Sequence, residues 1–140
     1  MYRIVVLMIV TAGALLAACG PGASAGPTTV PITMTEFKID TPQTTFKVGV
    51  PYRFVVSNKG TVNHDFSISP PVMEGMAGMS MEDAHKGALA VIDANDMPPG
   101  ATKTIDLTFS KPMSSSEMEF ACHTPGHYES GMHVPITVTQ

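Results

Sequence analysis

Most of this chain alternates between apolar and polar residues with a period of two, which is the pattern of half-buried β-strands. Between residues 102 and 109, Ile105, Leu107 and Phe109 share one face of such a strand, and polar residues occupy most of the other face. The alternation recurs over residues 32–40, 52–58 and 135–139. A helical period is visible only around residues 80–92, so the pattern predicts an all-β protein.

Turn signals separate the predicted strands. Residues 58–60 (Asn-Lys-Gly) and 98–100 (Pro-Pro-Gly) indicate turns, and the alternation changes phase at Glu36 and Phe37, where we predict a β-bulge. About seven or eight short strands in roughly 110 residues are typical of a Greek-key β-sandwich with two sheets and one core. We therefore predict a folded domain over residues 30–140, large enough to fold without a metal.

The alternation also predicts the direction of individual side chains. His64 begins one strand and Cys122 ends another, and each shares the inward face of its strand with large apolar residues. The same phase predicts that the polar neighbours on these strands point to solvent, namely Asp65, Ser67, Glu117 and Glu119. If the two strand ends lie at the same end of the sandwich, His64 and Cys122 meet inside it.

The first residues differ in composition from the rest. Arg3 is followed by an apolar run over residues 4–16 and then by small residues, which is typical of a secretory signal rather than a membrane span. Residues 16–19 read LAAC and resemble the bacterial lipobox, which implies that residues 1–18 are removed and that Cys19 carries lipid. An ordinary signal cleaved nearby would instead leave Cys19 as a free thiol. Residues 19–29 are small, polar and proline-containing, so they indicate a flexible tether.

Charge and cysteine content limit the partners. Charged residues make up only 14% of the chain and the formal net charge is −4, which argues against nucleic acid as a partner. The chain has two cysteines, Cys19 and Cys122. In an exported protein they would be expected to pair, but a lipidated Cys19 cannot do so. Cys122 is then an unpaired thiol in an oxidising compartment, for which metal ligation is a good reason.

A histidine and a methionine follow Cys122 at equal spacing. His127 comes five residues after Cys122, beyond a bend at Pro125 and Gly126, and Met132 comes five residues after His127. One loop can thus deliver a thiolate, an imidazole and a thioether, while a distant strand supplies the imidazole of His64. Two histidines and a cysteine in a trigonal arrangement, with a weak axial methionine, are the ligand set of blue-copper electron-transfer sites.

The segment CHTPGHYESGM, residues 122–132, resembles the copper loop of the cupredoxins, and its Cys-x₄-His-x₄-Met spacing is similar to that of rusticyanin and auracyanin. Residues 60–68 resemble the upstream ligand segment of this family, and residues 98–109 resemble the strand before the copper loop. The resemblance covers roughly residues 30–140, and it implies one type 1 copper ion with these ligands: His64, Cys122, His127 and Met132. Many relatives have asparagine after the first histidine, where it ties the ligand loops together, whereas this sequence has Asp65.

The resemblance implies a copper protein that transfers single electrons between membrane-associated redox proteins and is not an enzyme. We expect a monomer at the periplasmic or outer face of a cell membrane, anchored through lipid on Cys19. An oxidase or nitrite reductase subunit is disfavoured because one short domain lacks the histidine sets for further copper ions. A nucleophilic pair of Cys122 with a histidine lacks a visible orienting group. We expect His123 to turn away from the core and His133 to be exposed or at a strand edge.

Residues 70–85 are rich in sulfur, with thioethers at Met73, Met76, Met79 and Met81 and an imidazole at His85. Thioethers select Cu(I), so one interpretation is a copper chaperone or homeostasis protein whose loop holds a second, labile Cu(I). The other interpretation is an apolar loop that covers the copper end of the domain or docks a partner through adaptable methionines.

Overall fold

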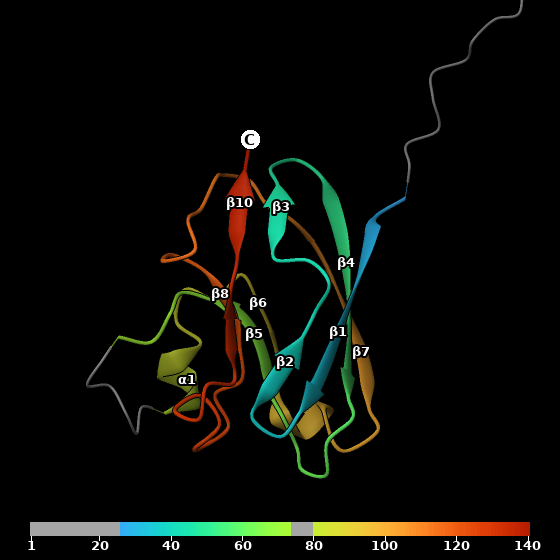
Figure 1. The fold of residues 1–140 in the computed structure, drawn as a ribbon, viewed down its shortest axis with the longest axis vertical. Helices are drawn as coiled ribbons and strands as arrows, with labels where there is room; N and C mark the ends of the chain where they lie inside the picture. Colours follow the sequence, from blue (N-terminus) through green and yellow to red (C-terminus); the bar gives the residue numbers. More distant parts are fainter. Residues whose placement is uncertain (1–25, 74–79) are drawn as a thin grey trace, which may run out of the picture.

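Two long strands form the centre of one sheet. β1 (Thr28–Thr35) and β4 (Pro51–Asn58) run parallel, and β2 (Lys38–Asp40) and β7 (Thr102–Thr108) flank them in the order β2-β1-β4-β7 (Figure 1). The structure is a computed structural model that describes residues 26–73 and 80–140. The expected signal segment, residues 1–18, lies outside the described residues, as do residues 19–25 of the expected tether. The first strand begins at Thr28, within the last residues of that tether.

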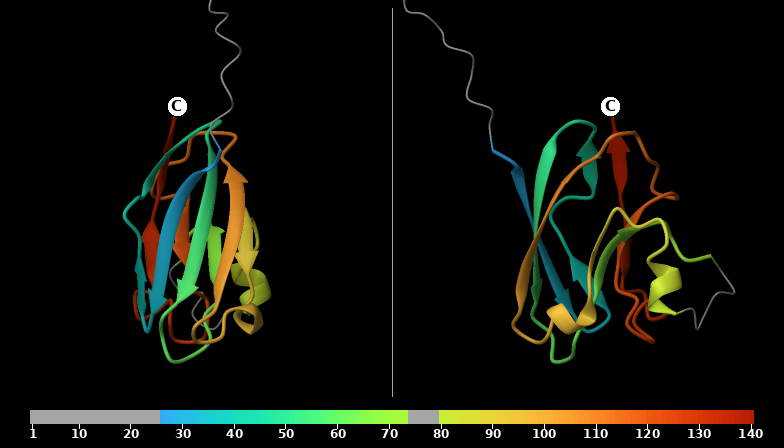
Figure 2. Two further views of the ribbon diagram at one scale, coloured as in Figure 1. Left: turned by 90° about the vertical axis from the view of Figure 1, so that its right-hand side faces the viewer. Right: turned by 180° about the vertical axis from the view of Figure 1, so that it is seen from behind.

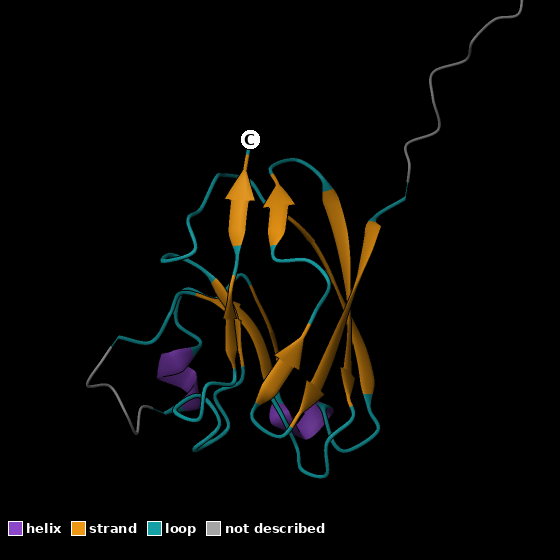
Figure 3. Ribbon diagram, viewed as in Figure 1, coloured by secondary structure: helices purple, strands orange, loops and turns teal. Residues whose placement is uncertain are grey.

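A second four-stranded sheet faces the first across the core, and the right-hand view of Figure 2 shows the two layers side by side. Its order is β6-β5-β8-β9, and its strands have these bounds: β5 (Phe66–Ser69), β6 (Ala90–Ile92), β8 (Glu119–Ala121) and β9 (His133–Pro135). β3 (Thr45–Lys47) and β10 (Thr137–Thr139) form a separate parallel pair at one end of the sandwich. Two short helices, α1 (Met81–Ala84) and the 3₁₀ helix η1 (Ala94–Asp96), lie outside the sheets (Figure 3).

The predicted all-β sandwich is confirmed, although the described residues hold ten strands where seven or eight were expected. Segments that read as one strand in the sequence are divided in the structure. Residues 32–40 contribute to both β1 and β2, and residues 135–139 contribute to both β9 and β10. Among the described residues, no helix combines the length and the apolar character that a membrane crossing requires.

The phase change at Glu36 and Phe37 is a hairpin turn, and the predicted bulge is wrong. β1 and β2 pair in antiparallel fashion with Thr35 opposite Lys38, so that Glu36 and Phe37 are the two residues of the turn. Phe37 has a φ of 60°, since tight two-residue hairpins need positive φ to follow the twist of the strands. A bulge and a tight turn both shift the alternation by one position, and the sequence pattern does not separate them.

Aromatic rings fill the space between the sheets. Phe54 on β4 is fully buried, and its ring centroid lies 5.5 Å from that of Phe46 and 5.6 Å from that of Phe120 on the opposite sheet. Phe109 completes this cluster, 5.4 Å from Phe46. Such rings contribute large apolar areas and favourable edge-to-face contacts. The core is therefore built independently of any metal.

The outer face of the second sheet is also covered, which the alternation did not predict. Every residue of β5 is buried, and described residues from 70–73 and 80–89 lie over this face: His85 Nε2 is 3.0 Å from Asp65 Oδ2, and the main-chain amide of Val72 donates to the hydroxyl of Tyr128 at 3.0 Å. Three of the four polar side chains expected at the surface are consequently buried: Asp65, Ser67 and Glu119. Glu117 is exposed, as expected.

Candidate metal centre

Strand pairing brings His64 and Cys122 together. β5 and β8 are antiparallel neighbours with Ser67 opposite Ala121, so the residues just before β5 lie beside those just after β8. His64 precedes β5 and Cys122 follows β8, and both are fully buried. His127 lies on the loop between β8 and β9, and its ring is also buried.

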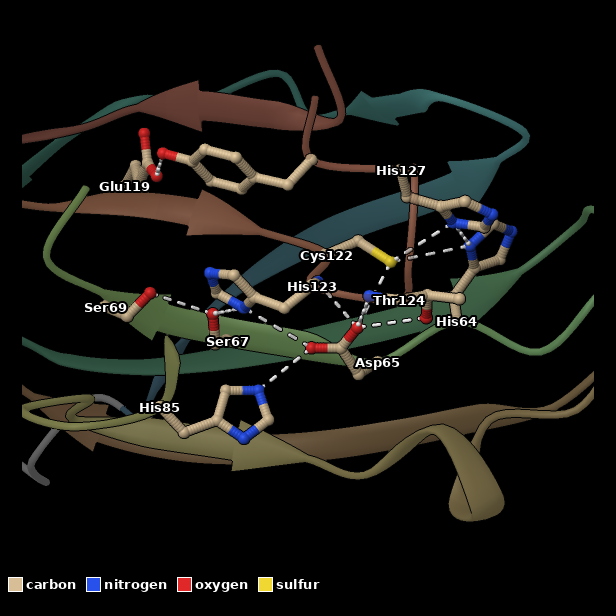
Figure 4. Close-up of polar contacts among 11 residues, drawn as sticks. His64, Asp65, Ser67, Ser69, His85, Glu119, Cys122, His123, Thr124 and His127 are labelled. Atoms are coloured by element: carbon tan, nitrogen blue, oxygen red, sulfur yellow. Dashed lines mark hydrogen bonds and ion pairs between the residues drawn. The ribbon is translucent and has the colours of Figure 1, made fainter. Parts of the chain in front are cut away.

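The three ligand atoms form a closed triangle (Figure 4). The Nδ1 atoms of His64 and His127 are 3.1 Å apart, and the Sγ of Cys122 lies 3.7 Å from the first and 3.5 Å from the second. A triangle with these sides has its centre about 2 Å from each corner, close to the metal–nitrogen and metal–thiolate bond lengths of about 2.0–2.3 Å that transition ions make in proteins. The geometry therefore fits one metal ion.

Met132 lies in the same part of the molecule. Its side chain is fully buried, its carbonyl accepts the amide of Cys122 at 3.0 Å, and its own amide donates to the carbonyl of His127 at 3.0 Å. These bonds fold the loop back so that the main chain of Met132 is next to Cys122. The structure thus gathers the four residues at one end of the sandwich, and their role as copper ligands stays a prediction.

The loop that carries His64 is held by the side chain of Asn58, the last residue of β4. The side-chain amide Nδ2 of Asn58 donates to the carbonyls of Val62 and Met97, both at 2.8 Å. Gly60 lies so close to the ligand that a Cβ there would be 2.9 Å from His64 Nε2, which explains why a residue without a side chain is needed. Burial, together with repulsion from His127, lowers the pKa of His64, so its ring is prepared to act as a neutral ligand.

Asp65 is one of the three polar residues that the sequence argument wrongly placed at the surface. Its Oδ1 accepts the main-chain amides of His123 and Thr124, both at 2.7 Å, and the Thr124 hydroxyl at 3.1 Å. The aspartate therefore ties the His64 segment to the copper loop, as asparagine is expected to do in relatives. Burial alone would raise the pKa of Asp65, but hydrogen bonds from His123, His85 and Cys122 hold it well below its usual range.

Cys122 needs a cation to become a thiolate. It is a free thiol, and burial, reinforced by the nearby charge of Asp65, raises the pKa of Cys122 to about 12. Its Sγ donates to Asp65 Oδ1 at 3.3 Å. A bound metal would take the place of the thiol proton, since metal ligands bind in their deprotonated form.

His127 is the ligand nearest to solvent. Its ring is 8% exposed and meets the edge of Phe37 with ring centroids 5.3 Å apart. Phe37 is 52% exposed, so the β1–β2 turn and the copper loop form one surface at this end of the sandwich. Nothing in the alternation pattern indicated that Phe37 approaches the site.

The remaining histidines of the loop lie on the other side of the sheet. His123 turns away from the core, as expected, but it is buried and stacks on Tyr128 with ring centroids 5.3 Å apart. His133 begins the edge strand β9, is half-buried, and pairs with Glu119 at 3.0 Å.

The methionine-rich segment is described only in part. Met73 is 77% exposed and Met81 is the first residue of α1. Met76 and Met79 lie outside the described residues, so the interpretation of this segment as a Cu(I) site stays a prediction.

Comparison with known proteins gives two kinds of similarity. No protein-family model matches the chain. The chain is 32% identical over 117 residues to a copper-resistant cuproprotein CopI of Rubrivivax gelatinosus, covering 79% of this chain and 66% of the relative. It is 29% identical over 121 residues to a protein of the same name from Pseudomonas aeruginosa, covering 66% and 65%. The chain thus spans just under two thirds of the length of these relatives.

Solved structures share the fold at lower identity. A reduced auracyanin from Roseiflexus castenholzii superposes with a TM-score of 0.61 and 23% identity, covering 83% of this chain and all of that one. Rusticyanin from Thiobacillus ferrooxidans superposes with a TM-score of 0.59 and 14% identity, covering 80% and 78%. Both similarities concern the fold. The chain thus has a cupredoxin-like β-sandwich fold, and the buried histidine–cysteine–histidine triangle and the similarity to copper-resistant cuproproteins are consistent with a cupredoxin-like copper protein.

Proposed function

We propose that the chain holds one copper ion through His64, Cys122, His127 and Met132 and carries single electrons at this ion. The observation that carries the proposal is the buried triangle of two imidazole nitrogens and one thiol sulfur, with sides of 3.1, 3.5 and 3.7 Å. Bound copper would supply the one-electron Cu(II)/Cu(I) couple, for which thiolate, thioether and imidazole ligands are suited.

The protein's contribution is to keep the ligands in place. The side chains of Asp65 and Asn58 fix the ligand loops through hydrogen bonds to main-chain groups, so little movement accompanies a change of charge at the site. His127 is the ligand that reaches the surface, beside the exposed ring of Phe37. We propose this surface as the contact for redox protein partners, with the chain acting as a carrier and not as an enzyme.

The direction of the first strand supports a membrane-anchored arrangement. β1 and β4 are parallel, with Thr28 opposite Tyr52 and Met34 opposite Asn58. The chain therefore enters the domain at the end opposite to the loop of His64, which follows β4 (Figure 1). With signal removal after residue 18 and lipid on Cys19, a monomer so tethered would turn its copper end away from the membrane.

The test is the optical spectrum of the Cu(II)-loaded protein. A thiolate bond to copper gives an intense charge-transfer band, which should be present in the wild type and lost in Cys122→Ser. The matched control is Cys19→Ser, which removes the other cysteine of the chain and should keep the band. A wild-type protein without the band, or a Cys122→Ser variant that retains it, contradicts the proposal. Fast electron self-exchange of the loaded protein, measured by line broadening, tests the carrier role.

A second candidate function is copper tolerance, which the similarity to copper-resistant cuproproteins favours. In this case the chain would bind copper to withhold it, with help from the methionine-rich segment. Expression in a copper-sensitive bacterium separates the two roles. If tolerance is the function, growth on copper should improve, and leucine substitutions at Met73, Met76, Met79 and Met81 should reduce the gain. If the chain is only a carrier, these substitutions should leave self-exchange unchanged and the host should gain no tolerance.

A further inference from the structure

A second group of metal-binding side chains lies on the far side of Asp65 from Cys122. While Oδ1 of Asp65 faces the copper loop, Oδ2 lies 3.0 Å from His85 Nε2 and 3.5 Å from His123 Nδ1 (Figure 4). Each of the three residues offers one ligand atom, and these atoms all lie within 4.8 Å of one another. The group is distinct from the copper ligands, because neither His85 nor His123 belongs to the buried triangle.

The imidazole of His123 makes only long polar contacts at the nitrogen that faces Asp65. Its side chain is only 4% exposed, its Nδ1 is 3.4 Å from Ser67 Oγ and 3.5 Å from Asp65 Oδ2, and its Nε2 has no partner. Distances of this length are at the limit of hydrogen bonding. Buried polar groups are normally well paired, and an exception calls for an explanation such as a missing ion. A metal bound at Nδ1 would replace the two long contacts of this nitrogen with one short bond, whereas Nε2 takes no part in the group.

Three separate segments converge to form this group. Asp65 precedes β5, His123 follows Cys122, and His85 is the residue at the C-terminal end of α1. The chain after His85 is bonded to the sheet, since the main-chain amide of Leu89 donates to the carbonyl of Ile68 on β5 at 2.7 Å. The His85 side chain is 14% exposed, so the group lies close to the surface and an ion can enter without unfolding.

We propose that Asp65, His85 and His123 form a second metal site, for a divalent transition ion of the Zn²⁺ or Cu²⁺ class. Two imidazoles and one carboxylate suit these ions. A tetrahedral ion with bonds of about 2.0–2.1 Å holds its ligand atoms about 3.3 Å apart, and the two measured separations from Asp65 Oδ2 are 3.0 and 3.5 Å. The third separation, between the imidazole nitrogens of His85 and His123, is no more than 4.8 Å, so side-chain adjustments suffice to accept the ion.

Asp65 links the two sites. Its Oδ1 is 3.3 Å from Cys122 Sγ, and its Oδ2 would ligate the second ion. A cation there draws negative charge away from the Cys122 sulfur, so its binding should raise the reduction potential of a copper held by Cys122. This coupling rests on the proposed copper centre, whereas ion uptake at the second site does not.

The experiment counts ions. Protein already loaded with one equivalent of copper is dialysed against Zn(II), and both metals are measured by mass spectrometry. The expected result is one zinc per chain with the copper retained, and at least a tenfold loss of zinc affinity in His85→Ala and in His123→Gln. His133→Ala is the control, because His133 lies on the same face but outside the group, and it should bind zinc like the wild type.

Two outcomes overturn the proposal: copper-loaded wild type that takes up no zinc, or His85→Ala and His123→Gln variants that bind zinc as tightly as the wild type. The charge-transfer band of each variant shows that it has folded. Should His123→Gln lose the band, His85→Ala decides alone, since His85 is partly exposed and is not next to Cys122. If the protein fails to form the band at all, the zinc count on the metal-free protein and its His85→Ala variant still tests the second site.

Discussion

Replacing Asp65 with asparagine removes one negative charge beside the copper ligands and leaves the clamp in place. The asparagine Oδ1 can still accept the amides of His123 and Thr124, which lie 2.7 Å from the aspartate oxygen. What changes is the charge 3.3 Å from the Sγ of Cys122. Reduction of bound copper adds an electron at this point, and a neighbouring carboxylate opposes it. We therefore expect Asp65→Asn to raise the reduction potential.

The size of the shift follows from the distance. The carboxylate charge is shared by two oxygens, so its mean separation from the sulfur is roughly 4 Å, at which a unit charge contributes about 4 kcal/mol with an effective dielectric constant of about 20. For one electron this corresponds to about 170 mV. Hydrogen bonds from His85, His123 and Thr124 already offset part of the carboxylate field, so we expect a rise on the order of 100 mV.

The assay is voltammetry or redox titration of the copper-loaded proteins at fixed pH and ionic strength. Glu129→Gln is the matched control, because Glu129 is an exposed carboxylate on the same loop whose charge is screened by solvent. It should shift the potential by less than a third as much. If Asp65→Asn leaves the potential unchanged or lowers it, or if Glu129→Gln has an equal effect, the electrostatic role assigned to Asp65 is wrong.

Three further predictions concern packing and protonation. Phe54→Ala should lower the free energy of unfolding by about 3–5 kcal/mol, because it leaves a cavity in the aromatic core, and Val62→Ala at an exposed position should change it little; urea unfolding measures both. Gly60→Ala should weaken copper binding at least tenfold, because the new Cβ would lie 2.9 Å from His64 Nε2. Gly26→Ala is the control, since its Cβ meets no atom within 4 Å and should leave copper affinity unchanged. A competition titration with a chelator measures the copper affinity of both variants. In the metal-free protein the pKa of His64 is lowered, so on acidification the unfolded state gains a proton near pH 6.5 that the folded state does not. The free energy of unfolding should therefore fall as the pH drops from about 7 to 5. His64→Gln should make the free energy of unfolding less dependent on pH in this range.

Much of the fold was accessible to sequence reasoning because it depends on short-range patterns. Alternation over seven to nine residues identified the strands that contain Phe54 and Leu107, since successive side chains of a strand must point to opposite faces. The spacing of Cys122, His127 and Met132 lies within one loop, so their proximity also follows from the sequence. The same local view placed His64 on an inward face, where the structure has it.

The tertiary structure decided what covers each face and which distant segments meet. Alternation describes one buried face, and it gave no sign that the other face of the second sheet is also covered, with Asp65 and Glu119 buried there. It also could not show that His85 reaches Asp65, 20 positions away, or that the phase change before Lys38 is a turn. The physical reason is that strand periodicity records the chain's own pleat, whereas burial and convergence depend on contacts between segments that are far apart in sequence.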